Sequence, residues 1–431
     1  MSGANPGLGY EATPPFSAPL RFFLTAPLFG IVAGLVLIGD SGLLASRWTP
    51  GTLAVVHLFA VGFLLQIMLG ALIQIMPVVA GAALPAPLLT ARLTHVGLSL
   101  GAAGLAAGLG FGLPVVLIGA AALLGLSIFG FLGCATVAII RAPKSSMASH
   151  TPRDLRLSLT GLALSVVLGL SIALGLSGGA ALPLPFTTQV NLHAGWALLG
   201  WAGILLAAVS WVVVPMFQIT PAYPVALTRY WAPAILGLLC AWSVLSITGF
   251  DQTAIVLALA LIAAVICFAG ITLRQQARTR RSTPDASFRA FRLAMVTLIA
   301  GAGLLAFPHF SDAEHWPVLA GILVLHGGLG GATSAMLYKI VPFLAWLHLT
   351  QAKVKAPNVK KMLPDARAKA QLRMHVLALA ALLAAALAPA LGALAGLALI
   401  VEFGWLMLNL LHVVRMWRAN APTPRRAVTP D

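Results

Sequence analysis

Three histidines in long apolar segments are the residues of this sequence best suited to bind a metal. Each is followed in its own segment by a proline, and the pairs are His57 and Pro77, His193 and Pro215, and His326 and Pro342. The histidines recur at intervals of about a third of the chain, which indicates an internal threefold repeat. An imidazole inside a membrane is costly enough to indicate a function, and imidazole ligates haem iron, copper and zinc. Because packing alone gives no reason to retain it three times, we predict that at least two of the three histidines bind a metal or a haem.

The composition requires a membrane. Hydrophobic residues make up 60% of the 431 positions and charged residues 8%. Several apolar runs reach the roughly 20 residues that cross the hydrocarbon core of a bilayer. Most of these runs lack the polar face that a helix of a water-soluble protein presents to solvent. We therefore predict an all-α polytopic membrane protein.

The apolar runs predict twelve transmembrane helices. Their expected ranges are 20–39, 53–79, 93–112, 114–140, 156–178, 190–216, 231–249, 252–273, 292–307, 317–343, 373–390 and 395–417. Charged connections divide them into three pseudo-repeated groups of four, 20–140, 156–273 and 292–417, within one membrane domain that covers 1–431. The three histidines then lie on helices 2, 6 and 10, the second helix of each group. We expect residues 418–431 to form a flexible cytoplasmic tail.

The net charge of +16 follows the predicted topology and does not indicate nucleic-acid binding. When the loops are assigned alternately to the two sides, every Lys and Arg except Arg47 falls on the side of both termini. Basic loops stay in the cytoplasm, so we expect both termini to be cytoplasmic, in a bacterial-type inner membrane. These loops would contact anionic lipids, and no nucleic-acid partner is expected.

Other residue types narrow the choice of cofactor. Cys134, Cys240 and Cys267 stand singly inside apolar helices, which argues against disulfides, iron–sulfur clusters and covalently attached haem. A zinc enzyme usually has a carboxylate base near the metal, and helices 2, 6 and 10 contain none. Opposed histidines in an apolar, glycine-rich bundle favour haem.

This pattern of twelve helices in three groups, with outer histidines on helices 2, 6 and 10, resembles a known superfamily. It is the catalytic-subunit superfamily of haem–copper oxidases and nitric oxide reductases. The local sequence HLFAVGFLLQIMLGALIQIMP, residues 57–77, is similar to the second helix of small, divergent members. The NnrS family, haem- and copper-containing membrane proteins linked to nitric oxide metabolism, is a further candidate. The resemblance covers the whole chain as architecture and rests at residue level on three short helices.

The resemblance implies a role for each of the three histidines. His57 matches the helix-2 ligand of a low-spin haem, His326 a helix-10 haem ligand and His193 the helix-6 ligand of a copper centre. The chain lacks the second histidine of the family's His-x-His on helix 10, the histidine pair on helix 7, the Glu or Tyr that follows the helix-6 histidine, and the paired arginines between helices 11 and 12. The resemblance thus implies an oxidoreductase-like scaffold without the full copper-ligand set, and it leaves catalytic activity open.

The predicted site is one haem b held between His57 and His326. His193 would ligate a second haem, bind copper or donate a hydrogen bond. Arg47, at the outer surface, would pair with a haem propionate. Catalytic residues are not assigned.

Two further residues bear on this site. Glu402 is the one carboxylate deep in a predicted helix, where it is protonated or paired with Lys339 or another polar group. His375 is expected to be interfacial, at the cytoplasmic end of helix 11, and to take no part in the site.

The expected function is redox, electron transfer or a role in NO metabolism, with a redox partner such as a cytochrome. Two other functions stay open. A membrane transporter is one, because twelve helices with internal repeats also describe carriers, although carriers usually contain two repeats. A haem- or copper-handling assembly factor is the other.

Overall fold

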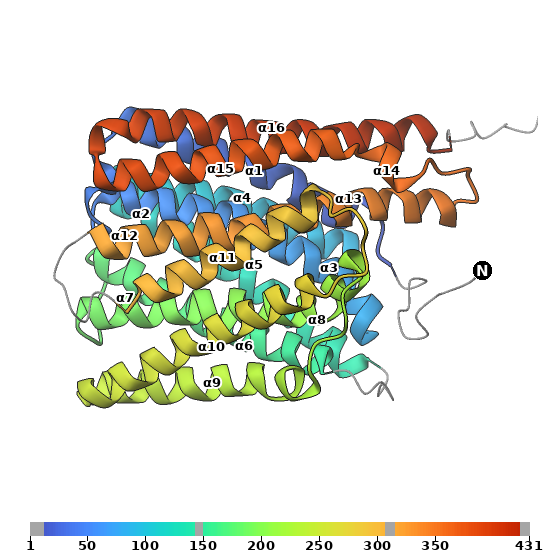
Figure 1. Ribbon diagram of the computed structural model, residues 1–431. Helices are drawn as coiled ribbons and strands as arrows, with labels where there is room; N and C mark the ends of the chain where they lie inside the picture. Colours follow the sequence, from blue (N-terminus) through green and yellow to red (C-terminus); the bar gives the residue numbers. More distant parts are fainter. Residues whose placement is uncertain (1–12, 143–149, 307–314, 423–431) are drawn as a thin grey trace, which may run out of the picture.

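The structure is a computed structural model, and it describes residues 13–142, 150–306 and 315–422. Most of these residues form apolar helices (Figure 1). Twelve helices within these ranges are long and apolar enough to cross a membrane, and no strand occurs among the described residues. The predicted polytopic all-α fold is confirmed. Eight of the twelve spans are single α-helices: α1 (Ser17–Gly39), α4 (Pro87–Gly110), α5 (Pro114–Arg141), α6 (Thr151–Leu176), α9 (Val225–Thr248), α10 (Asp251–Ala277), α11 (Ala286–Leu304) and α15 (Asp365–Leu387).

Two elements near the end of the chain complete the described structure, the last span and a short helix that precedes α15. The last span joins η7 (Pro389–Leu391) to α16 (Gly392–Asn420). The first residues of the predicted tail therefore continue α16, and residues 423–431 lie outside the described part of the chain. Between the tenth and eleventh spans lies the one-turn helix α14 (Val359–Met362).

The second, sixth and tenth spans each contain a π-helical segment between two α-helices. Their elements are α2 (Pro50–His57), η3 (Leu58–Leu65) and α3 (Gln66–Ala80); α7 (Phe186–Gly195), η4 (Trp196–Gly203) and α8 (Ile204–Gln218); and α12 (His315–Gly321), η6 (Ile322–Gly330) and α13 (Gly331–Gln351). In all three spans the π segment ends about a dozen residues before the internal proline. π segments are rare, and here they recur at equivalent places in the second span of each predicted group of four.

The three histidines differ in register against this repeat. His57 and His193 precede their π segments, whereas His326 lies inside its own. The spacing from the proline shortens accordingly in the third repeat. His326 therefore lies deeper in the bundle than the other two.

The first and last spans pack against each other and so bring the first and third groups together (Figure 1). Gly34 of α1 and Gly396 of α16 meet backbone to backbone, because a Cβ built on Gly34 would lie 2.5 Å from the carbonyl oxygen of Gly396. Small residues allow such close approach between membrane helices.

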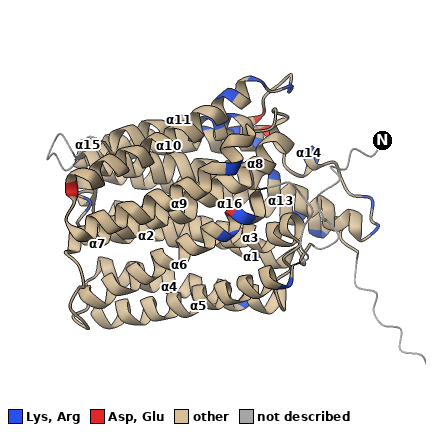
Figure 2. Cartoon of the chain, turned by 90° about the horizontal axis from the view of Figure 1, so that it is seen from below, with Lys and Arg blue, Asp and Glu red and all other residues tan. Residues whose placement is uncertain are grey.

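Charged side chains are unevenly distributed along the bundle. Figure 2 shows most Lys and Arg at the end of the bundle where α14 lies, and few at the opposite end. This asymmetry matches the positive-inside rule if the α14 end faces the cytoplasm.

We predict that a fluorescent protein, which is active in the cytoplasm, will give a signal when fused in the loop 278–285 or after Asn420, and that an exported phosphatase fused there will be inactive. Fusions in 40–49 and 177–185, at the opposite end, should be active only as external reporters. Phosphatase activity, which requires export, and fluorescent-protein signal, which requires the cytoplasm, measure the two outcomes. External activity at 278–285 would reverse the assigned orientation.

In each group the first span packs against the π segment of the second: α1 against η3, α6 against η4 and α11 against η6. The middle contact is the tightest, because a Cβ on Gly161 of α6 would overlap the carbonyl group of Gly200 in η4. A backbone carbonyl cannot move aside as a flexible side chain can. Gly161 thus fixes the distance between α6 and the span that carries His193.

We predict that Gly161→Ala lowers the free energy of unfolding by about 1–3 kcal/mol, the usual cost of overpacking. Gly237→Ala in α9 is the matched control, since a Cβ there meets nothing within 4 Å. The control should melt at the wild-type temperature or slightly above it, because alanine favours helix. Thermal unfolding in detergent, followed by tryptophan fluorescence, measures both. Equal melting temperatures for the two variants would show that α6 and η4 do not pack as described.

Candidate functional site

His57 and His193, which we call the paired histidines, lie next to each other although they belong to different repeats. Their ring centres are 6.3 Å apart and their planes are inclined by only 14°. Nδ1 of His57 lies 2.7 Å from the carbonyl oxygen of Leu53, and Nδ1 of His193 lies 2.9 Å from that of Ser165. A carbonyl oxygen only accepts, so each Nδ1 carries the proton and donates it. Each Nε2 therefore keeps its lone pair, the tautomer that a metal-ligating histidine needs.

A small cavity opens beside the paired histidines. Its volume is about 70 Å³, and its walls include both imidazoles, Trp48 and Phe186. The guanidinium of Arg47 lies over the Trp48 ring, 4.3 Å from its centre. Arg47 is therefore one side chain away from the cavity beside the paired histidines.

The separation of the paired rings equals that of two imidazoles bound to one metal ion. Two metal–nitrogen bonds of about 2 Å each, plus the distance from each nitrogen to its ring centre, separate two opposed imidazole centres by about 6 Å. The observed separation is 6.3 Å. Nearly parallel rings are compatible with this arrangement.

The volume of the cavity distinguishes between a metal ion and a haem, which the two imidazoles alone do not. A cavity of about 70 Å³ holds a metal ion and small ligands. Pockets for drug-sized ligands measure about 300 Å³ or more, so a haem macrocycle does not fit between these side chains as they are arranged.

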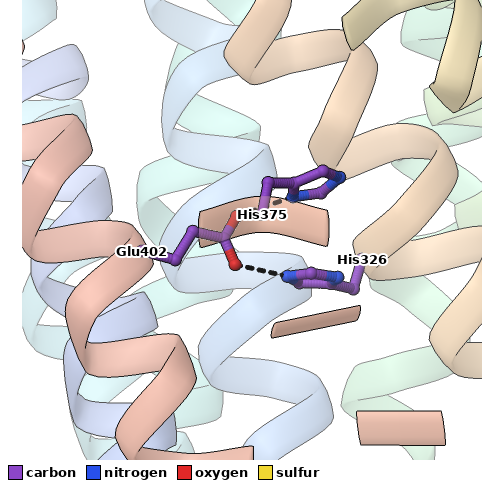
Figure 3. A group of neighbouring side chains, drawn as sticks. All are labelled: His326, His375 and Glu402. Atoms are coloured by element: carbon purple, nitrogen blue, oxygen red, sulfur yellow. Dashed lines mark hydrogen bonds and ion pairs between the residues drawn. The ribbon is translucent and has the colours of Figure 1, made fainter. Parts of the chain in front are cut away.

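A second cluster, the His–Glu–His cluster, consists of His326, His375 and Glu402 (Figure 3). The three residues come from η6, α15 and α16, and their relative exposures are 4%, 3% and 1%. Nε2 of His326 lies 2.7 Å from Oε2 of Glu402, and Nδ1 of His375 lies 2.7 Å from Oε1. The two rings are nearly parallel, with centres 4.7 Å apart.

The two histidines that we expected to share one haem lie in different clusters. The ring of Phe59 is 5.8 Å from that of His326. Residues two apart on a helix point to nearly opposite sides, so His57 faces away from His326 and towards His193. The structure therefore does not bring His57 and His326 together, and it pairs each with residues of other helices.

The expectation that His375 is interfacial is wrong. α15 begins at Asp365, well before the predicted start at residue 373, so His375 lies about 15 Å along the helix and is buried. The charged sequence DARAKAQLR, residues 365–373, had been assigned to the preceding loop. Length and hydropathy alone therefore gave the wrong depth for His375.

The partner of Glu402 also differs from the one we named first. Lys339 forms an ion pair with Asp285, whereas Glu402 is hydrogen-bonded to the two histidines. The sequence did contain one usable signal. A lone carboxylate deep in an apolar helix needs a polar partner, and another histidine is a candidate for that role.

A larger cavity lies on the other side of α7 and contains no imidazole among its lining residues. Its volume is about 570 Å³, and it is mainly apolar, with Arg47, Asn191 and Asp251 among its few polar residues. Such a cavity is large enough for a small organic molecule. It is separate from the cavity beside the paired histidines.

No protein-family model matches this chain, and no curated protein is significantly similar to it in sequence.

Proposed function

We propose that this integral membrane protein binds a redox-active transition metal at His57 and His193 and carries single electrons through it. One observation carries the proposal: both Nδ1 atoms are held by backbone carbonyls, and the two rings stand 6.3 Å apart with nearly parallel planes. Fixing the Nδ1 proton orients the ring and directs the Nε2 lone pair towards a metal.

Imidazole ligates both copper and the iron of a haem, and a haem would require the side chains around the cavity to be rearranged. The resemblance to haem–copper oxidases favours haem, and the cavity of about 70 Å³ favours a copper ion. In either form the metal would exchange one electron with a redox partner such as a cytochrome. The role of Arg47 depends on the form, since a propionate partner is needed only for haem.

A carrier of small molecules is the second candidate function. The observation that favours it is the cavity of about 570 Å³, whose few polar side chains include Arg47 and Asp251. Twelve spans with internal repeats also suit a carrier. This function makes no use of the paired histidines, so their substitution would leave transport unchanged.

We predict that the purified protein contains, or takes up from added Cu⁺ or haemin, one copper ion or one haem per chain at the paired histidines. His57→Ala and His193→Ala should each weaken binding at least about tenfold, because removing even an outer partner of a metal ligand costs that much. Elemental analysis measures copper and iron, and a pyridine haemochrome assay distinguishes haem from free ions. The reduced-minus-oxidised spectrum and electron paramagnetic resonance then report whether the centre changes by one electron.

His95→Ala is the matched control for these two variants. His95 is a partly buried histidine that hydrogen-bonds to Thr25 at 2.8 Å and belongs to neither cluster. This variant should keep the wild-type metal content and spectrum. If the wild type takes up neither copper nor haem, or if His57→Ala and His193→Ala bind as well as His95→Ala, the paired histidines are not a metal site.

A further inference from the structure

The His–Glu–His cluster gathers three metal-ligating side chains from three successive spans. His326, His375 and Glu402 lie on the tenth, eleventh and twelfth spans, and one ligand atom from each lies within 4.8 Å of the others. Phe59 and Phe403 lie against the ring of His326, at 5.8 and 6.3 Å between ring centres. The cluster is therefore enclosed by apolar side chains as well as by the surrounding helices.

The charge of Glu402 is balanced differently from that of the other deeply buried carboxylate. Asp154 pairs with Arg153 at 2.7 Å and accepts a hydrogen bond from Trp211. Among the described residues, no Lys or Arg forms an ion pair with Glu402, and the carboxylate is hydrogen-bonded to the two imidazoles. A buried carboxylate without a fixed cation is costly unless a proton or a metal ion neutralises it.

Each imidazole of the cluster also has a nitrogen without a partner. Nδ1 of His326 and Nε2 of His375 are buried and make no hydrogen bond with any described residue. In Figure 3 both lie on the sides of the rings away from Glu402. The nitrogens able to share a metal with the carboxylate are therefore the two that face it, Nε2 of His326 and Nδ1 of His375.

The donor set suits a divalent transition metal. Two imidazoles and one carboxylate form the protein ligands of many zinc and non-haem iron centres, with the remaining positions left open. An ion bound to Glu402 would neutralise it and take the lone pairs of the two nitrogens that face the carboxylate, Nε2 of His326 and Nδ1 of His375, with the proton of each ring moving to the nitrogen that faces away. Hard ions such as Mg²⁺ and Ca²⁺ prefer all-oxygen ligands, which the cluster does not offer.

We propose that His326, His375 and Glu402 form a second metal site, which binds a divalent first-row transition metal ion through one nitrogen of each imidazole and the carboxylate. This site is independent of the paired histidines, since its ligands come from other helices and face the opposite side of the second span. It needs neither haem nor copper at His57 and His193.

The test uses the full chain carrying His57→Ala and His193→Ala, so that the first site cannot bind metal. Co²⁺ is the probe, because its visible absorption reports coordination by protein ligands. After metal removal, this background should bind one Co²⁺ per chain and develop visible bands, and Zn²⁺ should displace the Co²⁺. Adding His375→Ala or Glu402→Gln should weaken Co²⁺ binding at least about tenfold, whereas adding His95→Ala should not.

A second measurement does not require the His375→Ala and Glu402→Gln variants of the His–Glu–His cluster to fold. X-ray absorption at the cobalt edge, recorded on the background with His326, His375 and Glu402 intact, should show nitrogen and oxygen ligands that include two imidazoles. Absence of Co²⁺ and Zn²⁺ binding in this background would overturn the proposal and leave protons as the only occupants of the cluster. Binding without imidazole ligands, or binding that folded His375→Ala and Glu402→Gln variants retain in full, would overturn it as well.

Discussion

Polar side chains inside a membrane-spanning bundle must find their partners within the protein, and this constraint governs the interior of the chain. Water is excluded there, so an unpaired imidazole or carboxylate is expensive. Asp154 is paired with an arginine and an indole, and the amide nitrogen of Asn409 donates to the hydroxyl of Tyr338 and to the carbonyl oxygen of Arg367. The two histidine clusters meet the constraint only in part, because several of their ring nitrogens are left as lone pairs.

The threefold repeat supplies the scaffold for both clusters but does not make them alike. All three histidine-bearing spans have a π segment and an internal proline in the same register. In the first two repeats the histidine precedes the π segment, and the two side chains meet. In the third it lies within the π segment, at a depth where the eleventh and twelfth spans supply a histidine and a glutamate. A displacement of the histidine by about one helical turn along the repeat thus separates two outer donors from a deeper one.

The sequence predicted the spans well and the pairing of side chains poorly, and the reason is physical. A bilayer imposes length and hydropathy on every span, and both can be read from the apolar runs. The face that a side chain occupies depends instead on helix rotation, and a π segment adds a residue to a turn and rotates everything that follows. Nothing in the sequence around His57 revealed η3. Nor did apolarity reveal that α15 extends into the charged sequence before residue 373, which is why His375 was placed too near the surface.

The second span forms a wall that both clusters share. His57, the last residue of α2, faces His193, while Phe59 at the start of η3 faces His326 and Phe403. The two contacts are separated by a single residue of backbone, so a rotation of this span would disturb both clusters at once. The packing of α1 against η3 and of α1 against α16 opposes such a rotation. The tight glycine contacts between first spans, π segments and the last span therefore do more than stabilise the fold. They hold the histidines on opposite faces of one helix and so keep the two clusters apart.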